Sequence, residues 1–166
     1  MASPDPVLHL CGPAATTRLG GALAKELRAG DTLLLSGPIG AGKTHLARAV
    51  IQALLARDNR HEDVPSPTFT LVQRYDTAAG EVLHADLYRL ADVRDLDDIG
   101  LSDALGQAIC LIEWPALLGP GTPATALHLT LAPDPERDDC RLLTLGGAHG
   151  RWQGIAARLA EAEGVA

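Results

Sequence analysis

Cysteine is scarce in this 166-residue sequence, which contains only Cys11, Cys110 and Cys140. The three are scattered along the chain, with neither the spacing of a metal site nor that of a disulfide framework. We therefore expect three reduced cysteines that serve as small apolar residues in or near strands. Reduced thiols in turn favour the cytoplasm as the location of the protein.

Long apolar runs are also missing, since no stretch approaches the ~20 residues that cross a bilayer. Residues 1–6 lack the basic and then apolar layout of a signal peptide. The formal net charge of −7 leaves no surplus of cations to neutralise phosphate backbones. We therefore expect no membrane contact and no non-specific binding to nucleic acid.

The segments that are present alternate between helical and strand-like patterns, and the length fits one compact domain over residues 1–166. The pattern predicts strands at 32–36, 68–75, 81–86, 108–113, 127–131 and 142–145, and helices at 14–28, 43–57 and 151–163, with one or two short acidic helices in 92–106. This order predicts an α/β fold: a three-layer P-loop NTPase-like sandwich with a central mixed, mainly parallel sheet.

A glycine-rich segment joins the first predicted strand to the second predicted helix. Its sequence, GPIGAGKT, matches G-x-x-x-x-G-K-[ST], the phosphate-binding loop of nucleoside triphosphatases. Glycines let backbone N–H groups turn toward phosphate oxygens, while the lysine reaches the β- and γ-phosphates and the threonine binds magnesium. We predict ATP or ADP with Mg²⁺ as cofactors, contacted by Gly37, Gly40, Ala41, Gly42, Lys43, Thr44 and His45.

Two apolar strands each end at a single acid, EVLHAD at Asp86 and AICLIE at Glu113. A phosphate loop needs a strand-end carboxylate that holds or orients magnesium, although such an acid is otherwise an ordinary solvated side chain. We predict that at least one of the two reaches the metal, and that Asp86, Glu113 and Lys43 are catalytic. Neither Lys43 nor Lys25 lies in a guanine-reading N-K-x-D motif, so adenine is favoured.

Hydroxyl side chains cluster in SPTFT, residues 66–70, before a predicted strand. They suit a sensor of the γ-phosphate or its metal, and they equally suit a threonine-rich strand edge. His84 lies two residues before Asp86 and so faces the same side of its strand. Its alternatives are a proton shuttle and a buried, hydrogen-bonded histidine, and the second is favoured.

Five segments in order, TTRLG, GPIGAGKT, SPTFTLV, HADLYRL and LIEWP, closely resemble the bacterial TsaE family, also known as YjeE. The resemblance runs from about Thr16 to Trp114. It implies a magnesium-dependent ATPase, slow alone, that is required for the N6-threonylcarbamoyladenosine modification of tRNA. The implied partners are TsaD, which transfers the threonylcarbamoyl group, and TsaB. The family member does not itself perform the transfer and meets tRNA only indirectly, through that complex.

The resemblance also implies roles for the acids of the predicted site. Thr44 and Glu113 match the magnesium ligands of the family. Asp86 matches an acid that takes part in hydrolysis or contacts the metal through water. Residues 66–70 match a switch-like loop.

Further residues match positions near the nucleotide. Thr16 matches a threonine close to the adenine, and Trp114 a tryptophan close to the nucleotide. One arginine of the C-terminal hairpin, Arg137 or Arg141, is expected to approach it. Pro38 departs from the aspartate usual at its position, so we expect the hydrolysis rate, rather than phosphate binding, to differ from that of the family.

Two other functions remain open at this point. A small-molecule kinase on the same scaffold needs an acceptor pocket and an arginine-bearing lid, whereas residues 92–106 are acidic and better suit a partner surface. A nucleotide-gated binding module with negligible hydrolysis has the same site and differs only in rate.

Overall fold

A seven-stranded sheet with the strand order β1-β7-β6-β2-β5-β4-β3 runs through the molecule. The computed structural model describes residues 4–163. The elements are β1 (Val7–Cys11), α1 (Pro13–Glu26), β2 (Thr32–Ser36), α2 (Lys43–Arg57), β3 (Val72–Thr77), β4 (Gly80–Asp86), α3 (Asp95–Asp98), α4 (Leu101–Ala104), β5 (Ile109–Glu113), the 3₁₀ helix η1 (Pro115–Gly121), β6 (Leu127–Pro133), β7 (Cys140–Gly146) and α5 (Arg151–Ala162).

The centre of the sheet is parallel and its margins are antiparallel. Strands β6, β2, β5 and β4 pair in parallel, while β7 and β1 continue the sheet antiparallel at one end and β3 does so at the other. The predicted mixed sheet with a mainly parallel centre is thus confirmed. Four strands that end at one edge bring their carboxyl-terminal residues together there.

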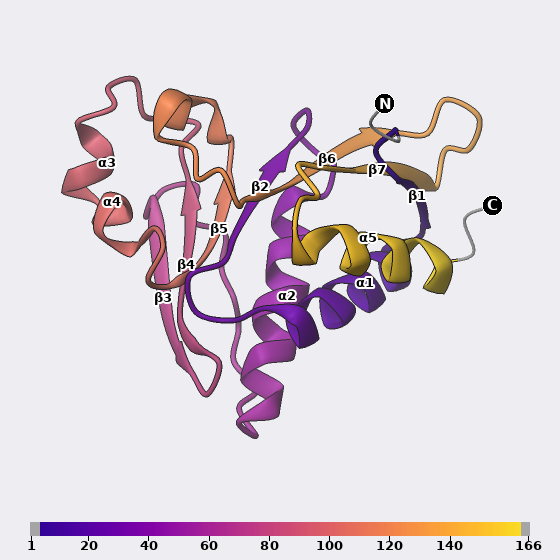
Figure 1. The fold of residues 1–166 in the computed structure, drawn as a ribbon, viewed down its shortest axis with the longest axis horizontal. Coiled ribbons are helices and arrows are strands. Elements are labelled where there is room, and N and C mark those ends of the chain that lie inside the picture. Colours follow the sequence, from indigo (N-terminus) through magenta and orange to yellow (C-terminus); the bar gives the residue numbers. More distant parts are fainter. Residues whose placement is uncertain (1–3, 164–166) are drawn as a thin grey trace.

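Helices cover both faces of the sheet, because the central strands are apolar on both sides. On β2, Leu33 and Leu35 pack into the core beneath α1, α2 and α5, whereas Leu34 packs into a second core with Leu96 of α3 and Leu101 of α4. Figure 1 shows the three long helices together on one side and α3 and α4 on the other. The predicted three-layer arrangement is confirmed. No helix in the described range is both long and apolar enough to cross a membrane.

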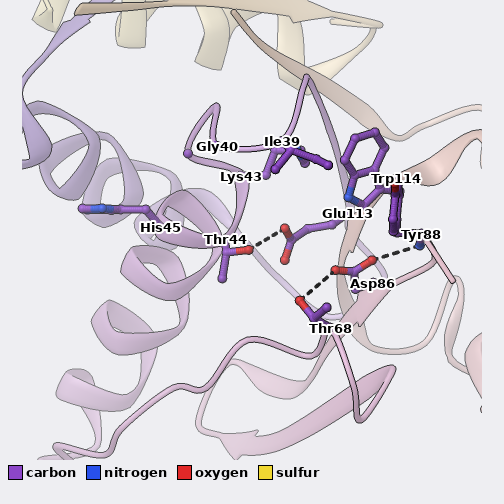
Figure 2. Close-up of a pocket in the computed structure, with 11 residues that line it drawn as sticks. Ile39, Gly40, Lys43, Thr44, His45, Thr68, Asp86, Tyr88, Glu113 and Trp114 are labelled. Carbon is purple, nitrogen blue, oxygen red and sulfur yellow. Dashed lines mark hydrogen bonds between the residues drawn. The ribbon is translucent and has the colours of Figure 1, made fainter. Parts of the chain in front are cut away.

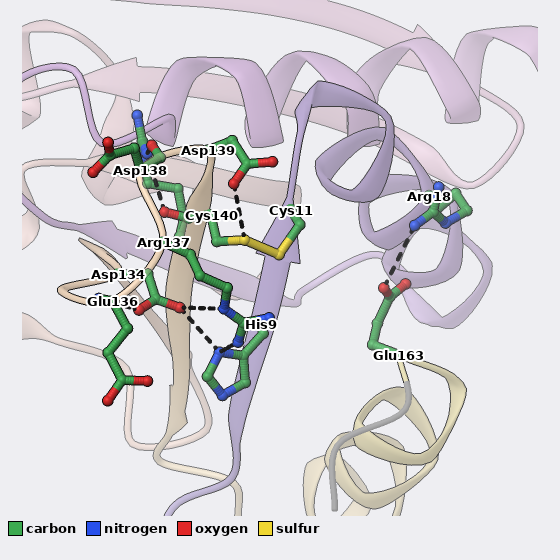
Figure 3. Close-up of a disulfide and its surroundings, with 11 residues drawn as sticks. His9, Cys11, Arg18, Asp134, Glu136, Arg137, Asp138, Asp139, Cys140 and Glu163 are labelled. Carbon is green, nitrogen blue, oxygen red and sulfur yellow. Dashed lines mark hydrogen bonds and ion pairs between the residues drawn. A yellow bond between two sulfur atoms is a disulfide. The ribbon is translucent and has the colours of Figure 1, made fainter.

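The N-terminal segment contains a strand, β1, and one end of a disulfide bond, neither of which was predicted from the sequence. Cys11 lies directly opposite Cys140 in the antiparallel β1–β7 pair, with 4.0 Å between the two Cα atoms, and their sulfurs are bonded (Figure 3). The prediction of three reduced cysteines is therefore wrong for these two. The pairing depends on a short strand that sequence analysis missed and on a partner 129 residues away. Cys110 is free and buried.

The hydroxyl-rich segment 66–70 also differs from its prediction as the start of a strand. Residues 67–70 form a turn, and β3 begins only at Val72. The N–H of Leu71 donates to the carbonyl of Pro67 at 2.8 Å, and the N–H of Asp86 donates to the carbonyl of Leu71 at 2.9 Å. These bonds hold the turn against the end of β4, so local pairing overrides the strand propensity of the threonines.

Candidate functional site

The glycine-rich loop leaves β2 in the middle of the sheet and enters α2. Gly37 has a φ of +141°, and a Cβ atom built on it would lie 2.3 Å from the carbonyl oxygen of Leu131, so only glycine fits there. Gly42 precedes α2 with a φ of +105°, and no described side chain caps that helix. The N–H groups of the first turn of α2 are therefore available to an anion, at the positive end of the helix dipole.

Lys43 is held over this loop by two backbone carbonyl groups of the loop. Its Nζ donates to the carbonyls of Gly37 at 2.8 Å and Pro38 at 2.9 Å, and lies 4.2 Å from the centre of the Trp114 ring. Burial lowers the pKa of Lys43, while the nearby carboxylates of Glu113 and Asp86 oppose that shift. The ammonium group is thus held beside the loop by two of the loop's carbonyl oxygens.

The two predicted acids lie on neighbouring strands and face one another across the sheet edge. Asp86 of β4 is directly paired with Glu113 of β5, and both are buried. Glu113 Oε1 accepts the hydroxyl of Thr44 at 2.6 Å, and its Oε2 lies 2.8 Å from Nε2 of His84. Asp86 Oδ1 accepts the N–H of Tyr88 at 2.9 Å. Parallel pairing therefore brings together two acids that are far apart in sequence.

A cavity of about 370 Å³, called the main cavity below, lies between the loop and these acids (Figure 2). Eight of the residues predicted to be catalytic or to bind the nucleotide or the metal line it: Gly40, Gly42, Lys43, Thr44, His45, Asp86, Glu113 and Trp114. The structure thus gathers most of the predicted site around one space. Ile39, Thr68 and Tyr88 complete the lining, with Thr68 from the predicted sensor segment.

A second cavity of about 360 Å³ lies on the other side of the loop, beside α1 and β7. Thr16 and Ala41 line it, and Gly40, Gly42 and His45 are shared with the main cavity. Arg141 lines this second cavity, whereas Arg137 does not. Arg137 instead pairs with Asp134 at 3.4 Å and lies 2.8 Å from His9 (Figure 3). Of the two arginines considered, the structure places Arg141 nearer the glycine-rich loop.

The polar atoms around the main cavity suit a hard cation better than a soft one. Thr44, Asp86 and Glu113 offer oxygen atoms, the ligands that magnesium prefers. Within residues 4–163, no group of three or more His, Cys, Asp or Glu side chains forms a cage for a metal. Magnesium is commonly held by one or two carboxylates plus substrate phosphates, so this sparse donor set fits it.

Sequence analysis did not predict Tyr88 and Ile39 as site residues. The Tyr88 ring lies 4.8 Å from the Trp114 ring, beside Lys43, and Ile39 is largely exposed at the loop's tip. Tyr88 follows Asp86 by two residues, so its proximity to a strand-end acid was the available signal. Thr68 Oγ1 lies 3.5 Å from Asp86 Oδ2, too long for a strong hydrogen bond, and 2.7 Å from Ser66 Oγ.

Comparison with known proteins points to one family. The family described as threonylcarbamoyl adenosine biosynthesis protein TsaE matches residues 11–141. The tRNA threonylcarbamoyladenosine biosynthesis protein TsaE of Mycobacterium leprae is 36% identical over 155 residues, which cover 86% of this chain and 87% of that protein. The Rickettsia felis protein of the same name is 36% identical over 103 residues, 62% of this chain and 58% of that protein.

The fold has a solved counterpart. The crystal structure of Bacillus subtilis YdiB superimposes with a TM-score of 0.74, covering 98% of this chain and 99% of that one at 23% sequence identity. At this identity the likeness concerns the fold alone. It agrees with the α/β architecture predicted from the sequence.

Proposed function

The chain belongs to the TsaE family, whose members act in the biosynthesis of threonylcarbamoyladenosine in tRNA, and from this premise we propose that it is the ATP-binding and ATP-hydrolysing subunit of that process. One observation carries the proposal. Thr44, at the start of α2, donates to Glu113, at the end of β5, beside the buried ammonium of Lys43. A threonine, a carboxylate and a lysine in this order are the parts that a phosphate loop requires.

In this proposal the protein's own groups bind and orient the triphosphate. The N–H groups of residues 40–44 and the ammonium of Lys43 receive the phosphate oxygens. Thr44 and Glu113 hold the magnesium ion, which neutralises charge that develops on the phosphates. Asp86, fixed by the N–H of Tyr88, orients the attacking water. Adenine and ribose are expected in the second cavity, beside Thr16 and Arg141.

Hydrolysis by the isolated chain is expected to be slow. Among the described residues, the lining of the main cavity contains no arginine that could neutralise the transition state. Arg89 lies with its guanidinium 5.5 Å from the centre of the Phe69 ring instead. We propose that binding to a complex of TsaB and TsaD raises the rate, and that turnover acts on that complex while this chain performs no threonylcarbamoyl transfer.

A binding experiment tests the nucleotide site. The chain contains only two lysines, so Lys43→Ala and Lys25→Ala form a matched pair, one in the loop and one exposed on α1. Isothermal titration with Mg–ATP should show at least about a hundredfold weaker binding for Lys43→Ala, and unchanged binding for Lys25→Ala. Wild-type affinity in the Lys43 variant would disprove the assignment of the loop.

A turnover experiment tests the partner. ATP hydrolysis should rise when the TsaB–TsaD complex is added to the wild-type chain, with no phosphoryl acceptor present. Glu113→Ala should give no rise in hydrolysis, because the variant lacks the carboxylate that accepts the hydroxyl of Thr44. A wild-type chain that binds Mg–ATP tightly but never turns over with the complex would instead be a nucleotide-gated binding module. Phosphate transfer to an added small molecule would identify a kinase.

A further inference from the structure

His84 is a buried polar side chain that the proposed mechanism does not use. It lies on β4, two residues before Asp86, and its exposed fraction is 0%. It does not line the main cavity, so a ligand bound there would not touch it. Burying an imidazole is unfavourable unless its nitrogens are paired. The burial of the His84 imidazole therefore needs a specific explanation.

The hydrogen bonds of His84 point to one partner. Its Nε2 lies 2.8 Å from Glu113 Oε2, and since a carboxylate oxygen only accepts, Nε2 carries the hydrogen and donates it. Its Nδ1 has no hydrogen-bond partner among residues 4–163. The side chain thus leaves one nitrogen unpaired and uses the other on Glu113. An apolar residue would fill the same space without that unpaired atom.

Glu113 is held from two sides as a result. Thr44 of α2 donates to Oε1, and His84 of β4 donates to Oε2. With a single donor, the carboxylate could rotate about its last side-chain bond, whereas two donors from different elements fix its plane. Partners of this kind, one step removed from a metal, set the orientation and the basicity of the ligand.

We propose that His84 is a positioning residue, which fixes the carboxylate of Glu113 in the orientation that receives the magnesium ion of a bound nucleotide. The inference rests on the proposed function, because it assigns a partner to that function's metal ligand. A role as proton shuttle does not fit, since the side chain is fully buried and Glu113 is its only described hydrogen-bond partner. His84 acts on the reaction only through Glu113.

Two substitutions of equal polarity separate this role from a merely structural one. The amide nitrogen of Gln lies as many bonds from Cα as Nε2 of His, so His84→Gln keeps a donor toward Glu113. The amide nitrogen of Asn corresponds to Nδ1, so His84→Asn leaves Glu113 without its second donor. Both variants bury one amide in place of the ring and lose similar packing, which makes them matched controls for each other.

The readout is metal binding rather than stability. Mn²⁺ serves as the probe, titrated by electron paramagnetic resonance into protein saturated with a non-hydrolysable ATP analogue. Half-saturation should require at least about tenfold more Mn²⁺ for His84→Asn, while His84→Gln stays within about threefold of wild type. Binding of the analogue in EDTA should be the same in all three proteins. Equal Mn²⁺ affinity for the Asn and Gln variants would overturn the proposal.

A Glu113→Gln background distinguishes failure of this inference from failure of the proposed function. There, adding His84→Asn should change Mn²⁺ affinity no further, because the group that His84 orients is already altered. If Glu113→Gln binds Mn²⁺ as wild type does, Glu113 is not the metal ligand and the proposed function itself fails. If Glu113→Gln binds weakly but His84→Asn binds normally, only the role of His84 is refuted.

A measurement on the wild-type chain covers the case in which His84→Asn does not fold. Nitrogen NMR of ¹⁵N-histidine-labelled protein should show His84 with its hydrogen on Nε2, in slow exchange with water. A hydrogen on Nδ1 instead would remove the bond to Glu113 and with it the proposal.

Discussion

Pro38 contributes to the glycine-rich loop through its carbonyl oxygen rather than through an N–H. That oxygen accepts Nζ of Lys43 at 2.9 Å and the N–H of Ala41 at 3.1 Å. Proline lacks a backbone donor, but the donors proposed to receive the phosphates are those of residues 40–44, further along the loop. The hydrogen bonds of this position therefore run through its carbonyl oxygen and need no N–H.

Pro38 and Gly37 should respond in opposite ways to alanine. Pro38→Ala keeps the carbonyl, so Mg–ATP affinity should stay within about threefold of wild type. Gly37→Ala should weaken binding by at least about a hundredfold, because its Cβ would lie 2.3 Å from the carbonyl oxygen of Leu131 at a positive φ. Isothermal titration of both variants checks this. A large loss for Pro38→Ala would mean that the ring itself shapes the loop.

Single residues of the site differ in how far the sequence predicts them. Lys43 and Thr44 belong to a local motif, and Glu113 and Asp86 are recognisable as acids that end apolar strands. The choice between Arg137 and Arg141 was not predictable from the sequence. It depends on the pairing of β7 with β1 and β6, which local sequence does not specify.

At the scale of elements, α1 and α2 lie close together at Gly20. A Cβ atom on Gly20 would lie 2.5 Å from Cβ of Ala49 and 2.9 Å from its backbone carbon. Backbone cannot move aside as a flexible side chain can, so this glycine is required by packing. The neighbouring Gly21 has no atom of the described residues within 4 Å of its position for a Cβ. Packing between the two helices therefore requires glycine at position 20 but not at position 21.

Alanine at these two positions should shift stability in opposite directions. Gly20→Ala should lower the free energy of unfolding by about 1–3 kcal/mol through overpacking, and Tm by about 2–12 °C. Gly21→Ala should raise the free energy of unfolding by about 0.5–1 kcal/mol, because alanine favours the helix and meets no neighbour. Thermal unfolding followed by circular dichroism measures both. A stabilised Gly20→Ala protein would contradict the close contact between the helices.

Elements with a strong apolar pattern were predictable, and the strand with a weak pattern was not. Helix α2 and the strands β2, β4 and β5 show clear apolar patterns, and the structure places them as expected. Strand β1 has five residues, of which only Leu8 and Leu10 are buried in the core, so its pattern is weak. Its position is decided by pairing with β7, near the other end of the chain.

At the scale of the whole molecule, the Cys11–Cys140 bond joins the first strand to the last across almost the entire sequence. Strand β1 is an edge strand, paired with β7 alone among the strands of residues 4–163, and it contributes Leu8 and Leu10 to the larger core. The disulfide lies at the end of that pair, where Gly12 also donates its N–H to the carbonyl of Asp139 at 2.9 Å. Gly12 and Asp139 both line the second cavity, so the bond borders the expected nucleotide site.

Reducing this bond should lower the stability of the whole chain rather than of β1 alone. A cross-link between residues 129 apart restricts the unfolded chain strongly, so its loss should lower the free energy of unfolding by about 2–5 kcal/mol and Tm by about 4–20 °C. Cys11 is exposed, which gives a soluble thiol access to the bond. Differential scanning calorimetry with and without dithiothreitol measures the shift.

The third cysteine supplies the control for that measurement. Burial raises the pKa of Cys110 to about 12, so its thiol stays protonated at neutral pH and does not exchange with the disulfide. Cys110→Ser should therefore keep the dependence of Tm on dithiothreitol, whereas Cys11→Ser should have the lower Tm under both conditions. Three reactive thiols in the unfolded, unreduced wild-type protein would show that the bond does not form, and Tm would then not respond to dithiothreitol. A single thiol, with the predicted shift on reduction, would mean that the edge strand depends on a covalent link as well as on its packing and its pairing with β7.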